Sequence, residues 1–192
     1  LMAGSARYSA LLDANTLCPV PQRDLLLCLA VDGLYHARWT VRIHDEWTRN
    51  LAMNRPELAE RLPQLVALMN RIVPDCLIEN YEALIDGLEL PDAEDRHVLA
   101  AAITGHVDAI VTFNLKDFPG DVLGRYNIEA QHPDEFVLNQ LELRQIDALA
   151  AIKAMRARLR RPPQSAVDLI ATLERAGLPA SAAHLRRAQA LI

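Results

Sequence analysis

The sequence has few cysteines and no long hydrophobic run. No apolar stretch approaches the roughly 20 residues that a helix needs to cross a bilayer, so we expect no membrane-spanning segment. The first eight residues have neither a basic start nor an apolar stretch, so we expect no secretory signal peptide and a cytoplasmic location. The three cysteines, Cys18, Cys28 and Cys76, stand far apart without CxxC spacing, which argues against a disulfide framework and against a zinc ribbon.

Aromatic residues and lysines are also scarce. Aromatics make up 5% of the chain, so a prominent platform for stacking single-stranded bases is not expected. There are two lysines but 18 arginines, whose planar fork suits bidentate contacts to phosphate. With 192 residues, 51% of them hydrophobic, the chain can form one compact domain, or one domain with a small appendage, and wholesale disorder is excluded.

The formal net charge of −5 conceals a split along the chain. Up to Val137 there are 21 acidic and 11 basic residues, whereas from Leu138 onward there are 4 acidic and 9 basic residues. This asymmetry predicts an acidic site in the first part and a basic surface in the second. The densest basic stretch is either a patch that binds a nucleic-acid backbone or a solvated helix face; it holds Arg156, Arg158, Arg160 and Arg161.

Short apolar runs bounded by turn residues predict four buried strands, at residues 9–12, 76–78, 108–112 and 127–131. Apolar residues at helical spacing predict helices between them, over residues 21–34, 40–51, 57–73 and 92–105. Strands that alternate with helices pair in parallel, which predicts a three-layer α/β domain with a central parallel sheet. Ligands of such sheets bind beyond the carboxyl ends of the strands.

From Pro133 onward the pattern is purely helical. It predicts helices over residues 136–159, 165–176 and 179–192, with a break at Pro162-Pro163. We therefore predict an α/β domain over residues 8–137 and a C-terminal all-helical extension over residues 138–192.

Acidic and amide side chains fall at four places that a parallel sheet can bring together. They are Asp13 after the first strand, Glu46 on a helix edge, Asp92 with Asp95 at a helix start, and Asn114 with Asp117 after another strand. Carboxylates gathered at one edge repel one another unless a cation lies between them, and hard oxygen ligands favour Mg²⁺ or Mn²⁺. Such a metal lowers the pKa of a bound water and neutralises the charge that develops when a phosphodiester is attacked.

Each of these residues also has a purely structural explanation. Asp13 can stabilise a turn, Glu46 can be a solvated helix carboxylate, and Asp92 can cap a helix. Asp117 can be an ordinary loop residue. The functional interpretation gains weight because all four places coincide with predicted strand ends and helix starts.

Four motifs in order give the sequence a resemblance to a known family. They are Leu11-Leu-Asp-Ala-Asn15, then Glu46 within His-Asp-Glu-Trp, then Asp95-Arg-His-Val-Leu-Ala-Ala-Ala102, then Ile110-Val-Thr-Phe-Asn-Leu-Lys-Asp-Phe118. The chain from Ser9 to Phe136 resembles a PIN domain. It is most similar to the VapC-type toxin nucleases, in the branch with an Asn-Leu-Lys-Asp-Phe-Pro motif and a C-terminal helical region.

The resemblance implies a metal-dependent endoribonuclease with Mg²⁺ or Mn²⁺ as its cofactor. Its implied catalytic residues are Asp13, Glu46, Asp95 and Asp117, and its candidate metal ligands are Asp13, Asp95, Asn114, Asp117 and Asp92. Glu46 would position or deprotonate the attacking water, and the products would carry a 3′-hydroxyl and a 5′-phosphate. The chain has Asn114 where an aspartate is usual, so its amide oxygen replaces one carboxylate ligand and Asp117 can supply the missing charge.

RNA is the substrate that the resemblance implies. Candidate contacts to it are Asn15, Arg23, Arg96 and Lys116, whereas His44 and His97 are expected to support the site or to contact phosphate. The resemblance also implies a homodimer and a cognate antitoxin, which we expect in an exposed apolar groove near Leu26, Leu29 and Leu51.

Two other functions are compatible with the sequence. Receiver and haloacid-dehalogenase domains also carry an aspartate after a buried strand, although the second of these usually has another aspartate where this chain has Asn15. A PIN scaffold that binds RNA or a protein without cleaving it is the second alternative, and Asn114 is its support.

Overall fold

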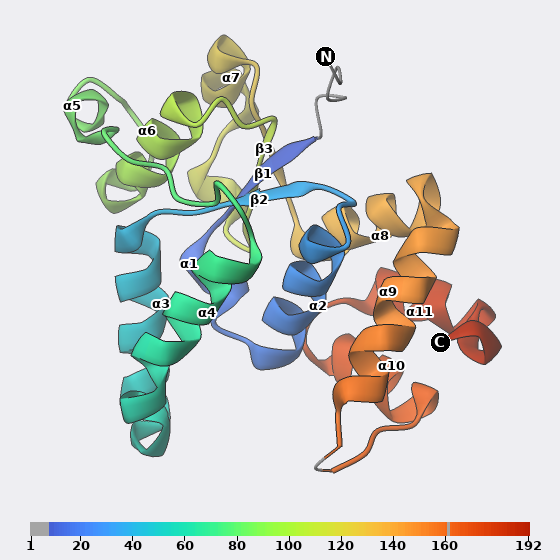
Figure 1. Ribbon diagram of the computed structural model, residues 1–192. Helices are drawn as coiled ribbons and strands as arrows, with labels where there is room; N and C mark the ends of the chain where they lie inside the picture. Colours follow the sequence, from blue (N-terminus) through green and yellow to red (C-terminus); the bar gives the residue numbers. More distant parts are fainter. Residues whose placement is uncertain (1–7, 161) are drawn as a thin grey trace, which may run out of the picture. The chain divides into compact units, whose positions relative to one another are not determined.

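The computed structural model describes residues 8–160 and 162–192 (Figure 1). The first seven residues and Arg161 of the basic stretch lie outside the described residues. The chain forms two compact units that interleave along the sequence: the first contains residues 8–18 and 35–132, and the second contains residues 19–34 and 133–192. The predicted domain division at residues 137 and 138 stays a prediction, since the compact units do not follow a single cut of the chain.

The first unit is built on a four-stranded parallel sheet. Its strands are β1 (Ser9–Leu12), β2 (His36–Arg38), β3 (Ala109–Val111) and β4 (Glu129–Gln131), in the order β2-β1-β3-β4. Leu12 pairs with Val111, so the ends of β1 and β3 lie side by side. All residues of β1 and β3 are buried, which explains why both strands are short apolar runs without alternation.

Three of the four predicted strands are confirmed and one is wrong. Residues 76–78 make only an isolated bridge, between Trp39 and Leu77, where the backbone of Trp39 bonds to Cys76 and Ile78. The fourth strand is instead β2, which lies at one edge of the sheet. The apolar pattern of the sequence did not distinguish it from the preceding helix. That helix ends earlier than predicted, at Val31, and Gly33 follows with a φ of 74°.

Helices of the first unit connect the strands and carry most of the polar side chains of interest. They are α1 (Ala14–Leu17), α3 (Val41–Asn54), α4 (Leu62–Ile72), α5 (Glu82–Ile85), α6 (Arg96–Thr104) and α7 (Gly120–Leu123). Short 3₁₀ segments accompany them: η1 (Pro56–Arg61), η2 (Ala93–Asp95), η3 (Leu115–Asp117) and η4 (Gly124–Tyr126).

The start and the buried face of α3 follow from its sequence. The Thr40 hydroxyl accepts a hydrogen bond from the backbone N–H of Ile43 at 3.1 Å and caps the helix. A cap of this kind stabilises a helix by about 1 kcal/mol. Ile43, Trp47 and Leu51 recur every four residues and are buried, as the spacing predicts. This packing fixes the rotation of α3 and therefore the direction of Glu46, which lies between Ile43 and Trp47.

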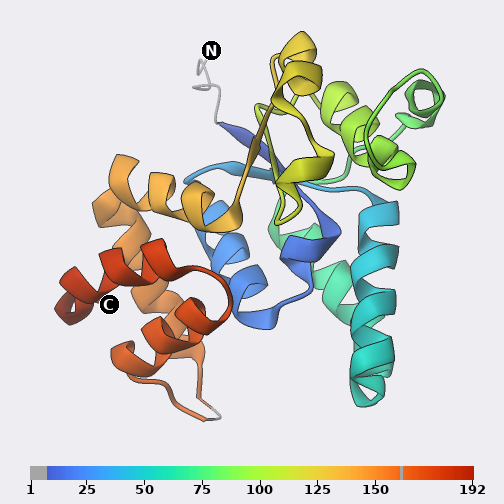
Figure 2. The same cartoon turned by 180° about the vertical axis from the view of Figure 1, so that it is seen from behind.

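The second unit is entirely helical. It contains α2 (Val20–Val31), α8 (Pro133–Leu143), α9 (Gln145–Arg158), α10 (Ala166–Arg175), α11 (Pro179–Arg187) and η5 (Gln189–Leu191), seen from both sides in Figures 1 and 2. The helical pattern predicted over residues 136–159 is confirmed, but a break at Arg144 divides it into α8 and α9. At the start of α10, Ser165 and Asp168 form a reciprocal capping box.

The predicted fold class is confirmed: a parallel α/β sheet domain is followed by a helical C-terminal region. Within the described residues, no helix is both long enough and apolar enough to span a membrane.

Candidate active site

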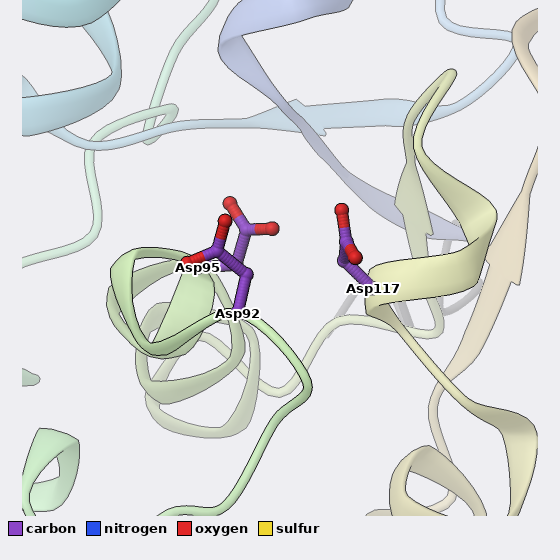
Figure 3. A group of neighbouring side chains, drawn as sticks. All are labelled: Asp92, Asp95 and Asp117. Carbon is purple, nitrogen blue, oxygen red and sulfur yellow. The ribbon is translucent and has the colours of Figure 1, made fainter.

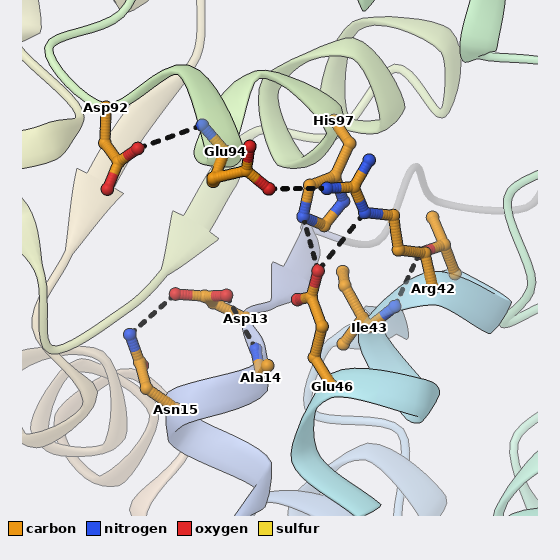
Figure 4. A network of polar contacts seen from close by, with 10 residues as sticks. Asp13, Ala14, Asn15, Arg42, Ile43, Glu46, Asp92, Glu94 and His97 are labelled. Atoms are coloured by element: carbon orange, nitrogen blue, oxygen red, sulfur yellow. Dashed lines mark hydrogen bonds and ion pairs between the residues drawn. The ribbon is translucent and has the colours of Figure 1, made fainter. Parts of the chain in front are cut away.

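Asp13 is the first residue beyond β1 and lies at the carboxyl edge of the sheet. Its backbone N–H bonds to Val111 O of the neighbouring strand at 3.1 Å, and its side chain caps α1 by accepting from Ala14 N at 2.6 Å (Figure 4). The other carboxylate oxygen accepts from Asn15 Nδ2 and from Thr112 Oγ1, both at 2.7 Å. Burial raises the pKa of Asp13 and the charge of Glu46 adds to this, while the hydrogen bonds from Thr112 and Ala14 oppose it.

Thr112 connects the ends of the two central strands. Its hydroxyl donates to Asp13 and accepts from Asn15 Nδ2 at 2.9 Å and from the Asn114 backbone N–H at 3.0 Å. Asn15 in turn accepts from Phe113 N at 3.1 Å through its amide oxygen. The carboxylate of Asp13 is therefore held in one orientation by fully engaged neighbours. Sequence reasoning placed Asn15 beside Asp13 but missed Thr112, because a threonine ending a buried strand gives no signal of its own.

Three further carboxylates gather at the same edge: Asp92, Asp95 and Asp117 (Figure 3). One oxygen from each lies within 4.8 Å of the others, a spacing that a single cation can bridge. Asp92 caps η2 through Glu94 N, and Asp95 is the last residue of η2, directly before α6. Asp117 ends η3, which follows β3. The three carboxylates therefore come from the segment at the start of α6 and from the segment after β3. Asp13 lies outside this group, although the sequence analysis names it with Asp95 among the candidate metal ligands.

The electrostatics of the cluster favour a bound cation. Burial, together with the charges of Asp13, Asp92 and Asp117, raises the pKa of Asp95 to about 6. Because Asp13 acts on Asp95 in this way, its carboxylate belongs to the same electrostatic site even though it lies outside the cluster. A divalent cation would relieve the repulsion, and carboxylate oxygens are the ligands that Mg²⁺ and Mn²⁺ prefer. The residues present therefore fit such an ion.

Asn114 acts on the cluster through its amide nitrogen. Its Nδ2 donates a hydrogen bond to Asp117 Oδ2, which fixes the carboxylate that the sequence offers as the replacement ligand. The amide oxygen of Asn114 is not used in this bond and is the atom that can face a cation. A neutral residue here also lowers the repulsion among the acids by one charge.

Glu46 is held by the side chains of a histidine and an arginine. Its Oε1 lies 3.0 Å from His97 Nε2 and 3.2 Å from Arg42 Nε, while Arg42 also reaches Glu94 (Figure 4). Burial would raise the pKa of Glu46, but the hydrogen bonds and charges of His97 and Arg42 outweigh it and lower the pKa. Glu46 thus stays ionised. Arg42 was missed by sequence reasoning, although its spacing of four residues from Glu46 is a typical ion-pair signal.

The two histidines next to the motifs have different environments. His97 is buried and contacts Glu46 through Nε2, and its Nδ1 has no hydrogen-bond partner among the described residues. His44 lies in a separate buried network, where Trp47 Nε1 donates to His44 Nδ1 at 2.9 Å and His44 Nε2 lies 3.0 Å from Asn70 Oδ1. Burial lowers the pKa of His44. His44 thus stabilises the packing of α3 with α4.

The cationic candidates for RNA binding differ in exposure. Lys116 is exposed on η3, and Arg96 is half-buried at the start of α6. Arg23 is buried in α2, which belongs to the second unit, so its side chain does not offer an exposed phosphate contact. In the basic stretch, Arg156 donates to Gln164 O at 3.0 Å and Arg158 contacts Cys28 Sγ, so both also support the second unit.

The exposed apolar groove expected near Leu26, Leu29 and Leu51 is not present there, because all three side chains are buried. Burial follows from their place on the inward stripes of α2 and α3. A groove of about 560 Å³ does lie along α3, η1 and α4, where Val41 and Val66 contribute apolar surface.

The parallel α/β sheet with acidic residues gathered at its carboxyl edge is consistent with the class of PIN-type folds. The sequence model described as PIN domain matches residues 9–116, and the chain therefore belongs to the PIN-domain family. A second model, described as VapC50 C-terminal domain, matches residues 133–187.

Among curated proteins, the chain is 44% identical over 94 residues to a Mycobacterium tuberculosis protein described as "Putative ribonuclease VapC50". The aligned part covers 49% of this chain and 55% of that relative, so the chain spans about half of its length. No solved structure matches the chain.

Proposed function

We propose that this chain is a metal-dependent endoribonuclease that hydrolyses phosphodiester bonds of RNA. The observation that carries the proposal is the cluster of Asp92, Asp95 and Asp117 at the carboxyl edge of a PIN-family sheet, next to Asp13. The raised pKa of Asp95 supports it, because a protein that gathers repelling carboxylates in the absence of a cation is less stable than one that binds the cation. The relative described as a ribonuclease supports the substrate class.

Asp95 and Asp117 would hold Mg²⁺ or Mn²⁺, with Asp92, Asp13 and the amide oxygen of Asn114 completing the ligand set. Asp13 has three of its roughly four lone-pair sites occupied by hydrogen bonds, which leaves capacity for one further contact. When bound, the ion would neutralise charge on the attacked phosphate and lower the pKa of a nearby water.

Glu46 would orient the attacking water. Its Oε1 is held by His97 and Arg42, which leaves Oε2 to accept a hydrogen bond from water. Because its pKa is lowered, Glu46 is a weak base, so we assign it orientation of the water ahead of proton removal. His97 and Arg42 would act as positioning residues. Attack by the oriented water would break the bond to the 3′-oxygen, leaving a 3′-hydroxyl and a 5′-phosphate.

Substrate contacts would come from side chains near the acidic cluster. Lys116 is exposed one residue before Asp117, and Arg96 follows Asp95 directly, with a buried Nε that has no partner among the described residues. Both would bind phosphates that flank the cleaved bond. Asn15 would hold Asp13 in place.

The biological role that we propose is that of the toxin in a type II toxin–antitoxin pair, acting on cytoplasmic RNA. An antitoxin would restrain the nuclease by covering its surface, and the groove along α3 and α4 is the candidate place in the first unit. Expression of the chain alone should then arrest growth, and Asp95→Asn should remove the arrest.

The direct experiment measures RNA cleavage and checks separately that each variant is folded. Purified chain with Mn²⁺ or Mg²⁺ is expected to cut RNA into fragments with 5′-phosphates. Asp95→Asn and Asp13→Asn should abolish cleavage while the circular dichroism spectrum is retained. Asp121→Asn is the matched control, since Asp121 is an exposed acid on α7 outside the cluster.

Two outcomes would contradict the proposal. Cleavage that persists in Asp95→Asn would remove the acidic cluster from the chemistry. Tight RNA binding without cleavage, at any divalent metal concentration, would favour the non-cleaving scaffold that Asn114 supports.

A further inference from the structure

Two aromatic rings meet at the same edge of the sheet as the acidic cluster. Phe113 lies two residues beyond the end of β3, and His132 lies one residue beyond the end of β4. Val111 pairs with Gln131, so both rings belong to segments that leave the sheet at its carboxyl edge. The ring centroids are 4.9 Å apart and the ring planes are 83° apart, which is an edge-to-face contact. The fold thus assembles an aromatic pair from a chain that is poor in aromatic residues.

Hydrogen bonds of its neighbours fix Phe113 beside the site. Its backbone N–H donates to Asn15 Oδ1 at 3.1 Å, and Asn15 Nδ2 donates to Asp13 at 2.7 Å. The next residue along the chain, Asn114, donates to Asp117 of the cluster. Phe113 is therefore connected through one neighbour to each of these two acids, and its position relative to them is set before a ligand arrives.

The ring of Phe113 keeps an open face. In an edge-to-face pair, the partner ring covers at most one face of each ring, so His132 leaves at least one face of Phe113 uncovered. Both side chains are half-buried, so part of the pair is accessible to solvent. Exposed aromatic faces beside a phosphate-binding site are typical of proteins that stack the bases of single strands.

We propose that Phe113 stacks on a base of single-stranded RNA, next to the phosphate held at the acidic cluster, and that His132 is a positioning residue for the Phe113 ring. This inference rests on the proposed function, since it takes RNA as the substrate. Every base has a flat face, so the contact adds affinity without selecting a sequence. The bases of a duplex are already stacked on one another, so the contact favours single strands over duplexes.

A nucleotide fits this position better than an apolar segment of a protein. The ring lies in polar surroundings, because Asn114 follows it and the exposed Lys116 lies three residues further on. A nucleotide combines a flat apolar face with a negative phosphate, and so it matches both the ring and the cation. The groove along α3, η1 and α4, which is the candidate place for a protein segment, is lined by other residues.

Binding measurements on the full chain test the stacking without requiring cleavage. Fluorescence anisotropy compares a short single-stranded RNA with an oligomer of equal length that has the backbone but no bases, in Ca²⁺ in place of Mn²⁺. The native chain should bind the RNA about tenfold more tightly than the abasic oligomer. Phe113→Leu keeps apolar bulk but has no ring face, so it should bind the two oligomers within about threefold of each other.

Two further variants serve as companions. Phe113→Trp should keep the preference for RNA, because its ring also offers a face for stacking. Tyr126→Ala is the matched control: Tyr126 is 39% exposed on η4, which precedes the amino end of β4 at the opposite edge of the sheet. Its removal should leave the preference unchanged. In the cleavage assay, Phe113→Leu should raise KM by about tenfold and change kcat by less than about threefold.

Several outcomes would overturn the stacking. They are a native chain that binds both oligomers equally, and a folded Phe113→Leu chain that keeps the native preference. If Phe113→Leu does not fold, Phe113→Trp decides, since RNA should quench the introduced indole, and emission that RNA leaves unchanged would overturn the proposal. Binding with a base preference but without cleavage would contradict the proposed nuclease activity and support the stacking. Cleavage without a base preference would do the reverse.

Discussion

His97 Nε2 lies 3.0 Å from Glu46 Oε1 and joins the first turn of α6 to the middle of α3. His97 follows Asp95 by two residues, so this contact ties the carboxylate of Glu46 to the segment that carries an acid of the cluster. The position of Glu46 relative to the cluster therefore depends on a buried side chain that would touch neither metal nor RNA.

Replacement of His97 should therefore lower the rate of RNA cleavage more than it weakens RNA binding. His97→Ala frees Glu46 to rotate, and we expect kcat to fall by about 10- to 100-fold, with KM changed by less than about threefold. His97→Gln should recover part of the loss, because its side-chain amide can donate to Glu46 Oε1. Steady-state cleavage of a short RNA measures both constants.

Arg42→Gln is the companion variant for His97. Arg42 also contacts Glu46 but is partly exposed, so its loss should have a smaller effect on kcat. Equal kcat values for His97→Ala and the native chain, with both folded, would show that Glu46 needs no support from His97.

The amino-acid sequence was sufficient to predict the sheet edge that carries the site, because strand ends and helix starts are local signals. β1 and β3 are continuous apolar runs, and in a parallel sheet their ends meet. That reasoning brought Asp13 and Asp117 to one edge, and the helix start at Asp95 to the same place. The short β2 was missed because three residues of a half-buried edge strand have no periodicity to detect.

Contacts between distant segments could not be predicted in the same way. Whether His44 or His97 faces Glu46 depends on the rotation of α3 against α6, which is set by the packing of buried side chains such as Ile43 and Trp47. The interleaving of α2 with the C-terminal helices is likewise a tertiary feature: Cys28 of α2 donates to Ala151 O of α9, across 123 residues of sequence.

Thr112 is expected to matter for stability as well as for the orientation of Asp13. Thr112→Val keeps the shape of the side chain but removes the donor to Asp13 and the acceptor for Asn15 and for the Asn114 N–H. Since Thr112 is fully buried, we expect the free energy of unfolding to fall by about 1–3 kcal/mol. Thr112→Ser keeps the hydroxyl and should lose less. Urea denaturation compares them, and equal midpoints for the valine and serine variants would contradict the role of the hydroxyl.

The affinity of the site for a divalent metal should depend on pH. Burial and the neighbouring carboxylates raise the pKa of Asp95 to about 6, so Asp95 is protonated below that pH and must lose its proton to act as a ligand. Mn²⁺ affinity should therefore fall by about tenfold per pH unit below pH 6 and level off above pH 7. Calorimetric titration in buffers with different ionisation enthalpies measures the proton released. The range from pH 5 to pH 7 brackets the pKa of about 6. A Mn²⁺ affinity that stays constant over this range would show that Asp95 is not a ligand.

The same raised pKa predicts that Asp95 destabilises the metal-free protein at neutral pH. A carboxyl whose pKa is raised from 3.8 to about 6 by folding favours the folded state while it is protonated, and this advantage disappears as the pH rises through about 6. Asp95→Asn has no charge to repel the other acids. Asp95 is only partly buried, so solvent screening reduces the effect of its charge. We expect Asp95→Asn to raise the free energy of unfolding at pH 7 by about 1 kcal/mol, equivalent to roughly 2–4 °C in Tm. Mg²⁺ should raise the Tm of the native chain and leave that of Asp95→Asn almost unchanged. A native chain that melts above the variant without metal would mean that hydrogen bonds to Asp95 outweigh the repulsion in the cluster.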